Sequence, residues 1–373
     1  MADTYTGRFL TSTLQEDGTL RLAIGERSFS APGEGEVLVQ VEASPINPSD
    51  LGMLLASADI GSAERDAEGT RLTVSPAVVA AMKARVGHPM PVGNEGAGTV
   101  VAAGPDAASQ ALLGRTVAGL GGAMYAQYRK LPLGQCLVLN EGTSAADGAS
   151  CFVNPLTALG MVDTMRMEGH TALVHTAAAS NLGQMLVKIC LADGVPLVNV
   201  VRKPEQAKLL RDLGATHVVD TSEDGAQEAL VDAIAETGAT LAFDATGGGK
   251  LADRLLSAME AALQRQGGDF NRYGSSTHKQ VYIYGGLERA PTTLNRSYGM
   301  AWGLGGWLLT PFMERAGAER MQELRQRVAD EIHTTFASSY ARELSLDDVL
   351  DPEQIAYYGR MSTGEKVLVN PQA

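Results

Sequence analysis

The run Ala172-Leu173-Val174-His175 has the apolar character of a buried strand, and it leads into Thr176-Ala177-Ala178-Ala179-Ser180-Asn181-Leu182-Gly183. Residues in this second run stay small up to the point where a helix should begin. That helix, over residues 182–192, carries apolar residues at helical spacing, so one of its faces can pack on a sheet. Gly194 ends the helix, and residues 197–201 form a second buried strand. The pattern predicts a βαβ unit whose crossover helix presents its N-terminus to a pyrophosphate.

The turn after the first strand departs from the usual glycine pattern of dinucleotide-binding folds. That pattern has three glycines, and only the last of the three equivalent positions is glycine in this chain. This third glycine is the one that lets helix and strand pack closely. The serine can cap the helix and offer its hydroxyl to a phosphate. An ordinary βαβ connection is the alternative, but we expect this turn to bind a dinucleotide through Ala179, Ser180, Asn181, Leu182 and Gly183.

The end of the second strand indicates which dinucleotide would bind. An acidic residue about 20 positions after the glycines would hydrogen-bond the ribose 2′-hydroxyl, whereas an arginine suits a 2′-phosphate. Here Arg202 stands at that place, with Lys203 beside it and no acid before Glu205. A pair of solvated surface cations is the alternative explanation. Taken with the turn, the pair favours NADPH over NADH.

Length, charge and cysteine content limit the possible classes of protein. A chain of 373 residues is long enough for two domains, each with its own core. The formal net charge of −13 argues against a nucleic-acid partner, which requires a basic face. The three cysteines are far apart and encode neither a disulfide framework nor a structural zinc. Because no signal peptide and no apolar run of about 18 residues is found, we expect a soluble cytoplasmic protein with no membrane partner.

The first part of the chain, up to about residue 145, is rich in strand signals. Residues 21–24 and 35–43 alternate apolar and polar side chains at period two, as half-buried strands do. Residues 98–104 and 116–118 have the same character. Residues 57–83 are polar and permit helix, and we interpret them as an insertion over a barrel.

After residue 220 the sequence continues to alternate between helix and strand. Helices are predicted at 227–235, 250–263 and 311–332, and strands at 241–244 and 281–284. The last strand, at 366–369, should rejoin the first domain. We therefore predict one domain from residues 1–145 and 325–373, and a dinucleotide-binding domain from residues 146–324.

These landmarks resemble those of a known group of enzymes. They include Asn47-Pro48-Ser49-Asp50, Gly93-Asn94-Glu95-Gly96-Ala97-Gly98, Asn154-Pro155-Leu156-Thr157-Ala158 and Tyr284-Gly285-Gly286. From about residue 35 to residue 371 the chain resembles the medium-chain dehydrogenase/reductase superfamily, in its zinc-free quinone oxidoreductase and 2-enoyl thioester reductase branch. The resemblance implies an α/β fold in which a GroES-like β-barrel catalytic domain and a doubly wound parallel-sheet (Rossmann) domain enclose the cofactor between them.

Zinc-dependent members of the same superfamily fit this chain poorly. Their catalytic metal would need a cysteine where this chain has residues 44–47, and a histidine where it has Asn94. His88 and Glu95 are close in sequence, but two ligands do not close a metal site. We therefore predict no metal.

The resemblance also implies roles for several residues. Asn47 would orient the nicotinamide ring or the substrate, although Asn47 and Asp50 could instead form a turn in which Asp50 caps a helix. Thr157 matches a threonine whose hydroxyl approaches the nicotinamide, and it could equally be a packing residue. Lys366 matches a position near the cofactor phosphate, with a plain surface lysine as the alternative. Backbone groups that would touch the carboxamide belong to Tyr284, Gly285 and Gly286.

The proton donor is where this chain departs from the family pattern. Enoyl reductases of this branch commonly carry a tyrosine a few residues after the Asn-Pro-x-Asp string, but residues 51–57 contain none. Tyr125 is the nearest tyrosine in a comparable place, and a structural role there is the alternative. Solvent could also protonate the product, in which case no side-chain donor is needed.

Together these features predict an NADPH-dependent, zinc-independent oxidoreductase that transfers hydride to a conjugated C=C bond or to a quinone. A catalytically idle NADPH-binding relative and a zinc-free alcohol or aldehyde reductase are the alternatives. The apolar segment 302–309, with two tryptophans and several glycines, would form a subunit interface, part of the core, or a wall for an apolar substrate. Relatives imply a homodimer through the sheet edge, acting on a small-molecule substrate.

Overall fold

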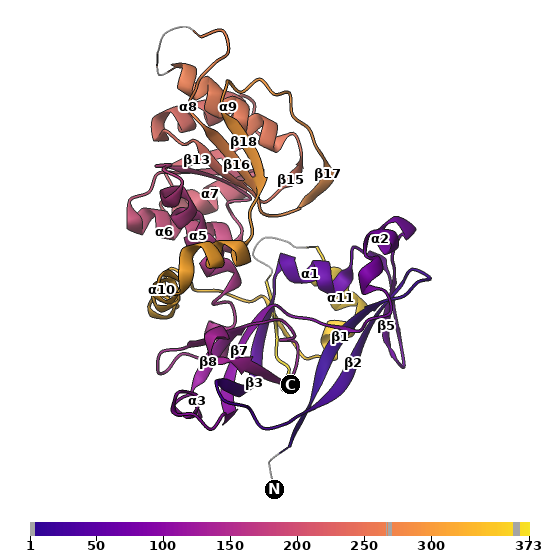
Figure 1. Cartoon of the computed structure of the whole chain (residues 1–373). Coiled ribbons are helices and arrows are strands. Elements are labelled where there is room, and N and C mark those ends of the chain that lie inside the picture. The colour runs from indigo at the N-terminus through magenta and orange to yellow at the C-terminus, as the bar shows by residue number, and fades with distance from the viewer. Residues whose placement is uncertain (1–3, 266, 268–270, 361–365) are drawn as a thin grey trace. The chain divides into compact units, whose positions relative to one another are not determined.

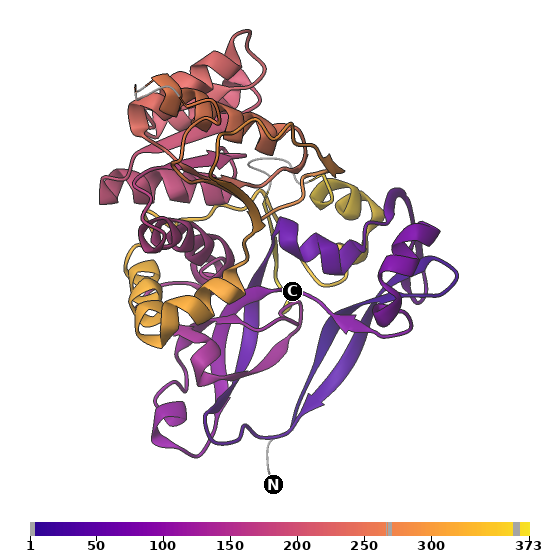
Figure 2. The ribbon, with the colours of Figure 1, turned by 45° about the horizontal axis from the view of Figure 1, so that its top comes forward.

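The computed structural model describes residues 4–265, 267, 271–360 and 366–373. The chain divides into two compact units, which Figure 1 and Figure 2 show from two directions. The first unit contains residues 1–153 and 325–373, and the second unit contains residues 154–324.

Two sheets make up the first unit. One has the strand order β4-β5-β2-β1-β6, and the other has the order β10-β8-β7-β3-β20-β19, with β9 paired to β3. The pairs are antiparallel except for β19 and β20, which run parallel. The last strand, β20, pairs with β3 and so rejoins the first unit, as the sequence predicted. The strand bounds are β1 Tyr5–Leu14, β2 Thr19–Phe29, β3 Glu36–Ile46, β4 Asp59–Asp66, β5 Gly69–Thr73, β6 Met90–Pro91, β7 Glu95–Ala103, β8 Thr116–Leu120, β9 Tyr128–Pro132, β10 Cys136–Val138, β19 Arg342–Leu344 and β20 Val367–Val369.

Short helices close the ends of these sheets. Their bounds are α1 Pro48–Leu55, α2 Pro76–Ala81, α3 Ala107–Gln110, α4 Ala145–Gly148 and α11 Pro352–Tyr358. Helix α4 packs against β3, β7 and β8, so residues 146–153 lie in the first unit and not in the dinucleotide-binding domain to which the sequence assigned them.

One expectation from the sequence, for residues 57–83, is wrong. This segment was interpreted as helix-permissive, but most of it is the hairpin β4–β5, and only α2 is an α-helix. In β5 the side chains of Thr70 and Leu72 are buried while Arg71 and Thr73 are exposed, which is the alternation of a half-buried strand. The alternation of β5 is short and its exposed face is polar, so the sequence did not indicate a strand.

The second unit contains a six-stranded sheet in which every pair is parallel, with the order β13-β12-β11-β14-β16-β18. Counted along the chain, this is the 3-2-1-4-5-6 order of a doubly wound dinucleotide-binding fold, which confirms the predicted fold of this part. The strand bounds are β11 Leu173–Thr176, β12 Leu197–Val201, β13 His217–Asp220, β14 Leu241–Asp244, β16 Lys279–Ile283 and β18 Trp302–Gly306.

Helices cover the sheet, and α8 and α9 pack on each other and on the strands in one apolar cluster. The helix bounds are α5 Val153–Met167, α6 Asn181–Asp193, α7 Pro204–Asp212, α8 Ala226–Thr237 and α9 Leu251–Arg265. Gly194 ends α6 with a φ of 65°, as predicted. A small parallel pair, β15 Gly247–Gly249 with β17 Glu288–Thr292, was not anticipated from the sequence.

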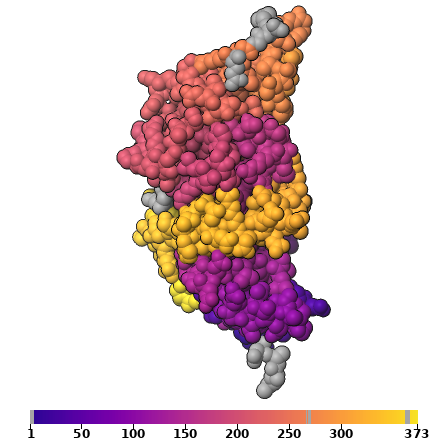
Figure 3. All heavy atoms as spheres, turned by 90° about the vertical axis from the view of Figure 1, so that its left-hand side faces the viewer, coloured from indigo at the N-terminus to yellow at the C-terminus, as the bar shows by residue number. Residues whose placement is uncertain are grey.

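Helix α10, Leu309–Asp330, is the orange-yellow band on the surface in Figure 3. It corresponds to the predicted helix at 311–332, but Gly317 has a φ of 80° and interrupts the helical conformation. None of the helices formed by the described residues has the length and apolarity needed to cross a bilayer.

The contact between α6 and β11 depends on a glycine. A Cβ atom built on Gly183 would lie 2.1 Å from the carbonyl oxygen of Ala178. That oxygen belongs to the backbone, so it cannot move aside as a flexible side chain could. Gly183 therefore allows the start of the helix to approach the turn that follows the strand.

We predict that Gly183→Ala destabilises the second unit by about 1–3 kcal/mol, the usual cost of overpacking. Gly286→Ala is the matched control, because no atom lies within 4 Å of a Cβ placed there. Its effect should stay within about 0.5 kcal/mol. Urea unfolding without cofactor measures both free energies, and equal midpoints for the two variants would refute the steric argument.

Candidate functional site

The turn between β11 and α6 has the geometry of a helix cap. Ser180 is the N-cap residue of α6, and its Oγ accepts a hydrogen bond from the backbone N–H of Gly183 at 3.1 Å. Ala177 adopts a positive φ of 50°, which reverses the chain after the strand. The positive end of a 13-residue helix therefore follows directly on the carboxyl end of the first parallel strand. This arrangement suits an anionic ligand.

Asp244 ties the neighbouring strand end to this turn, which sequence reasoning missed. Its Oδ1 accepts a hydrogen bond from the hydroxyl of Thr176 at 2.8 Å, and that hydroxyl oxygen accepts one from the N–H of Ala245 at 2.8 Å. The backbone N–H groups of Thr246 and Gly247 also donate to the carboxylate. The loops after β11 and β14 are thus fixed at the carboxyl edge of the sheet, where ligands of such folds bind. The only sequence signal was an acid at the end of a buried strand.

His175 and Tyr284 form a second contact within this region. The Nε2 of His175 lies 2.7 Å from the Tyr284 hydroxyl, and the two rings stack with centroids 5.8 Å apart. Burial lowers the pKa of His175 to about 3, so the ring is neutral at physiological pH. The side chain of Tyr284 is therefore engaged with the sheet. The backbone N–H of Tyr284 donates to the carbonyl oxygen of Asp244 at 3.0 Å, so the Tyr284 carbonyl group and the two glycines that follow are the groups that this part of the described chain leaves for a ligand.

The glycines after Tyr284 differ in their surroundings. A Cβ on Gly285 would lie 2.5 Å from the carbonyl oxygen of Ala245, so a larger residue does not fit there. Gly286 is exposed. Gly285 and Gly286 therefore bring backbone groups without side chains close to the loop that follows β14.

Arg202 and Lys203 follow the last residue of β12, and both side chains are exposed. The N–H of Arg202 donates to Oε1 of Gln206 at 3.3 Å. Within the described part of the chain, the Arg202 guanidinium has no hydrogen-bond or ion-pair partner. Lys203 lies 3.8 Å from the carboxylate of Glu205, a solvent-exposed pair that contributes little.

Thr157 lies in α5 and is 7% exposed. Every residue from Asn154 to Met165 in this helix is buried. Thr157 is thus packed within the unit, and its cofactor role stays a prediction.

In the first unit, Asn47 lies at the N-terminus of α1 and is buried. Its backbone N–H donates to Oδ2 of Asp50 at 2.8 Å, so Asn47 is the N-cap residue and Asp50 the third residue of α1, whereas the turn considered from the sequence had Asp50 as the cap. The Asn47 side chain contacts a different residue, because its Nδ2 donates a hydrogen bond to Oε1 of Glu95 at 2.7 Å. The buried Oδ1 of Asn47 has no partner among the described residues. An unsatisfied buried acceptor of this kind is costly and is consistent with a ligand site.

Glu95 is the centre of this cluster. It is 0% exposed, and besides the amide of Asn47 it accepts hydrogen bonds from the N–H groups of Phe152 at 2.8 Å and Val153 at 2.9 Å. Burial raises the pKa of Glu95, and it raises the pKa of the neighbouring Asp50 to about 7. The sequence singled out Glu95 only as an incomplete metal ligand, and its contacts with residues far along the chain could not be foreseen.

Lys366 lies beside these carboxylates. Its Nζ donates to the hydroxyl of Ser150 at 2.7 Å, and that oxygen lies 2.7 Å from the hydroxyl of Tyr340. Burial lowers the pKa of Lys366 to about 8, against the opposing effect of the negative charges of Glu95 and Asp50. Lys366 is therefore not a plain surface lysine.

Tyr125 has a different environment from that of an accessible proton donor. It is 0% exposed within the core of the first unit, and its hydroxyl donates to the carbonyl oxygen of Pro45 at 3.1 Å. Burial holds its pKa well above the usual value. This geometry supports the structural alternative for Tyr125.

Among the described residues, no three histidine, cysteine or acidic side chains lie close enough together to hold a metal ion. The cysteines Cys136, Cys151 and Cys190 are free.

Two protein families match the chain. Residues 33–172 match the family of alcohol dehydrogenase GroES-like domains, and residues 182–291 match the family described as zinc-binding dehydrogenase. The predicted GroES-like fold of the first part of the chain is thus confirmed.

Similar sequences belong mostly to reductases. A mitochondrial enoyl-[acyl-carrier-protein] reductase of Caenorhabditis elegans is 30% identical over 261 residues, which are 67% of this chain and 64% of that protein. A quinone oxidoreductase of Pseudomonas aeruginosa is 26% identical over 164 residues, 43% of this chain and 50% of that one. This chain therefore spans less than two thirds of the length of the curated relatives that it matches.

Solved structures share the fold over the whole chain. A Mesorhizobium loti protein described as an NADPH:quinone reductase has a TM-score of 0.73 at 24% identity and is covered completely, as is this chain. An Etr1p variant in complex with NADP and crotonyl-CoA has a TM-score of 0.66 at 18% identity, with 99% of this chain and 100% of that one covered. With its parallel sheet, its capped cofactor turn and both family matches, the chain belongs to the medium-chain dehydrogenase/reductase superfamily.

Proposed function

We propose that this protein is an NADPH-dependent, zinc-independent oxidoreductase that transfers hydride to the conjugated C=C bond of an enone or enoyl thioester, or to a quinone. The observation that carries the proposal is that the capped N-terminus of α6 occurs together with an exposed Arg202 at the end of the adjacent strand, whose guanidinium has no partner among the described residues. The first group suits a pyrophosphate and the second suits a 2′-phosphate.

The residues of the second unit fit NADPH. The turn of Ala179, Ser180, Asn181, Leu182 and Gly183 would hold the pyrophosphate, because a side chain at Gly183 has no room and the helix N-terminus favours negative charge. Arg202 and Lys203 would bind the 2′-phosphate. The backbone from Tyr284 to Gly286 would contact the carboxamide, with Thr157 near the ring. By family resemblance, Lys366 of the first unit would lie near the cofactor phosphate. When bound, NADPH supplies the hydride.

The acceptor class is supported by the relatives and by the side chains of the first unit. Enoyl reductases and quinone oxidoreductases both appear among the similar proteins. Both reactions build negative charge on an oxygen conjugated to the carbon that accepts hydride, and a hydrogen-bonding group must stabilise it. We assign Asn47 to orienting the ring or the substrate, since its amide is fixed by Glu95 and none of the described residues donates a hydrogen bond to its Oδ1.

We expect Arg202→Ala to weaken NADPH binding by about tenfold to a hundredfold, the value of a charged hydrogen bond to phosphate. NADH affinity should stay unchanged, because NADH has no 2′-phosphate. Lys208→Ala is the control, since Lys208 is an exposed cation of the next helix paired with Asp212. Calorimetric titration of the three proteins with each nucleotide measures the effect. Equal affinities for NADPH in all three proteins would show that Arg202 does not bind the 2′-phosphate.

The activity itself is tested by following NADPH oxidation with a trans-2-enoyl thioester, an enone, a quinone and an aldehyde. We expect turnover with at least one of the first three and a roughly 10–100-fold lower kcat for Asn47→Ala with NADPH affinity retained. Reduction of the aldehyde alone would indicate the alcohol/aldehyde reductase. Tight NADPH binding without turnover of any acceptor would indicate an idle relative.

We also propose that the protein is a cytoplasmic homodimer. The support for the dimer is strand β18, which ends the parallel sheet and pairs only with β16 among the described strands. An uncharged, glycine-rich edge strand is suited to pair with a second copy. Sedimentation equilibrium should give about twice 39.1 kDa, and Gly306→Lys should give the monomer mass. A monomeric wild-type protein would contradict the dimer. Cell fractionation tests the compartment, and the protein should be found in the cytoplasmic fraction.

A further inference from the structure

The proposed reaction needs a proton as well as a hydride. Adding hydride to a conjugated acceptor leaves an enolate or phenolate that must take up one proton. Residues 51–57 contain no tyrosine, and the Tyr125 hydroxyl is buried and donates to the carbonyl of Pro45. A side-chain proton donor in the first unit must therefore be another group.

A line of three hydrogen-bonded side chains runs through the first unit. The Nζ of Lys366 donates to Oγ of Ser150 at 2.7 Å, and Oγ of Ser150 is 2.7 Å from the hydroxyl of Tyr340. The Lys366 Nζ also lies 5.8 Å from the centroid of the Tyr340 ring. The three residues come from distant parts of the sequence, so only folding brings them together.

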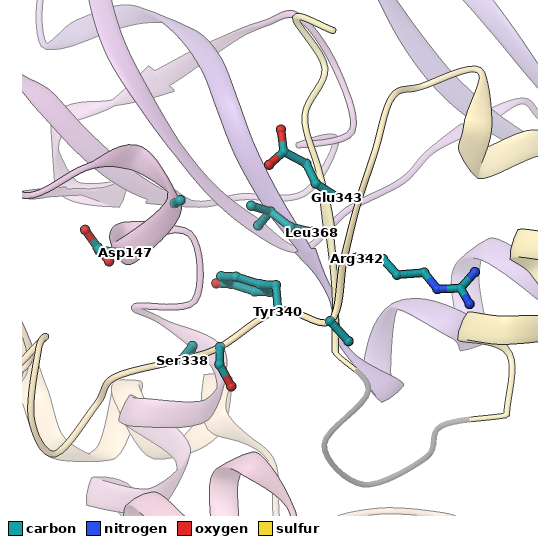
Figure 4. A pocket seen from close by; sticks show the side chains of 9 residues that line it. Asp147, Ser338, Tyr340, Arg342, Glu343 and Leu368 are labelled. Atoms are coloured by element: carbon teal, nitrogen blue, oxygen red, sulfur yellow. The ribbon is translucent and has the colours of Figure 1, made fainter.

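The outer end of this line reaches a pocket of about 340 Å³. Figure 4 shows the Tyr340 ring between the Asp147 side and Leu368, with its hydroxyl directed toward the α4 side of the pocket. Arg342 points away and stacks on Tyr357, so it does not fill the space. The pocket is lined by Ala146, Asp147, Ser338, Ser339, Tyr340, Ala341, Arg342, Glu343 and Leu368. It is large enough for several waters, and its polar groups can hold them.

The inner end lies at the buried carboxylates. The charge of Lys366 interacts with Glu95 and Asp50, and Glu95 is hydrogen-bonded to the amide of Asn47 at 2.7 Å. Val367 pairs with Ile46 between β20 and β3, so Lys366 and Asn47 are the residues that adjoin this pair. The line of side chains thus begins at a water-accessible pocket and ends near the residue that we assign to orienting the reactants.

We propose that Tyr340, Ser150 and Lys366 form a proton relay that carries a proton from water in this pocket to the reduced substrate near Asn47. The inference rests on the proposed function. The Lys366 ammonium loses one proton as a new C–H or O–H bond forms on the enolate or phenolate. The neutral amine then takes the proton of the Ser150 hydroxyl, Ser150 takes that of Tyr340, and Tyr340 takes one from water. Per turnover, one hydride leaves NADPH and one proton leaves the solvent.

The electrostatics of the inner end suit this role. Lys366 faces Glu95 of β7, Asp50 of α1 and Cys151 of the segment before α5, while Asp147 acts on Tyr340 from α4. Because burial lowers the pKa of Lys366 to about 8, the ammonium is present at neutral pH and gives up its proton more readily than an exposed lysine. The rate should therefore fall as the pH rises through about 8.

Tyr340→Phe tests the relay, since it removes one hydroxyl and keeps the ring. We expect a roughly tenfold lower kcat, a larger solvent deuterium isotope effect on kcat, and an unchanged affinity for NADPH. Ser339→Ala is the matched control, because Ser339 lines the same pocket outside the relay, and it should behave as wild type.

Lys366→Met should lower kcat by roughly a hundredfold and remove the fall in rate above pH 8. Circular dichroism and thermal unfolding check that each variant is folded, and Ser150→Ala provides a second break in the line.

The outcomes separate this inference from the proposed function. If the wild type turns over no acceptor, the proposed function fails before the relay is tested. If the wild type is active and Tyr340→Phe and Ser150→Ala match it in rate and isotope effect, the relay is overturned while the function stands. An effect of Lys366→Met confined to NADPH affinity would also overturn the relay and leave Lys366 as a phosphate ligand.

Discussion

The carboxylate of Glu95 is the interaction on which the first unit's site depends. A buried charge is tolerated only when it is fully hydrogen-bonded, and Glu95 meets this requirement with the Asn47 amide and the N–H groups of Phe152 and Val153. Leaving one such buried donor without a partner costs about 1–3 kcal/mol. These bonds therefore fix the end of β3, the start of β7 and residues 152–153 of the same unit relative to one another. The position of Asn47 follows from that requirement.

The second unit is organised by a different constraint, the close approach of backbone to backbone. At Gly183 and Gly285 a Cβ atom would come within 2.1 Å and 2.5 Å of a carbonyl oxygen. The Asp244 carboxylate then holds the loops after β11 and β14 through the Thr176 hydroxyl and two backbone N–H groups, and that hydroxyl accepts a further hydrogen bond from the N–H of Ala245. A ligand at this edge meets backbone groups that are already in place, so little ordering entropy is lost on binding.

Much of this fold could be predicted from the sequence where the pattern is local. The apolar run Leu241–Asp244 is β14, and the helix after Ala172-Leu173-Val174-His175 ends at Gly194 because its φ is positive. The hairpin β4–β5 was missed because its exposed face is polar and its buried face is short. Contacts such as Ser150 with Lys366, 216 residues apart, leave no local pattern, since each side chain alone reads as an ordinary surface residue.

The cluster around Glu95 also bears on the proposed role of Lys366 as proton donor. The pKa of Asp50 is about 7 and that of Lys366 is about 8, because burial raises the first and lowers the second. One pKa unit corresponds to about 1.4 kcal/mol, so a proton moves between such groups at small cost near neutral pH. The phenol of Tyr125 is far from this range, since burial raises its pKa further. In the proposed relay, a site with two buried acids and a partly buried lysine has its readily transferable proton on the ammonium group, and the residues that restore it need only be hydrogen-bonded to that nitrogen.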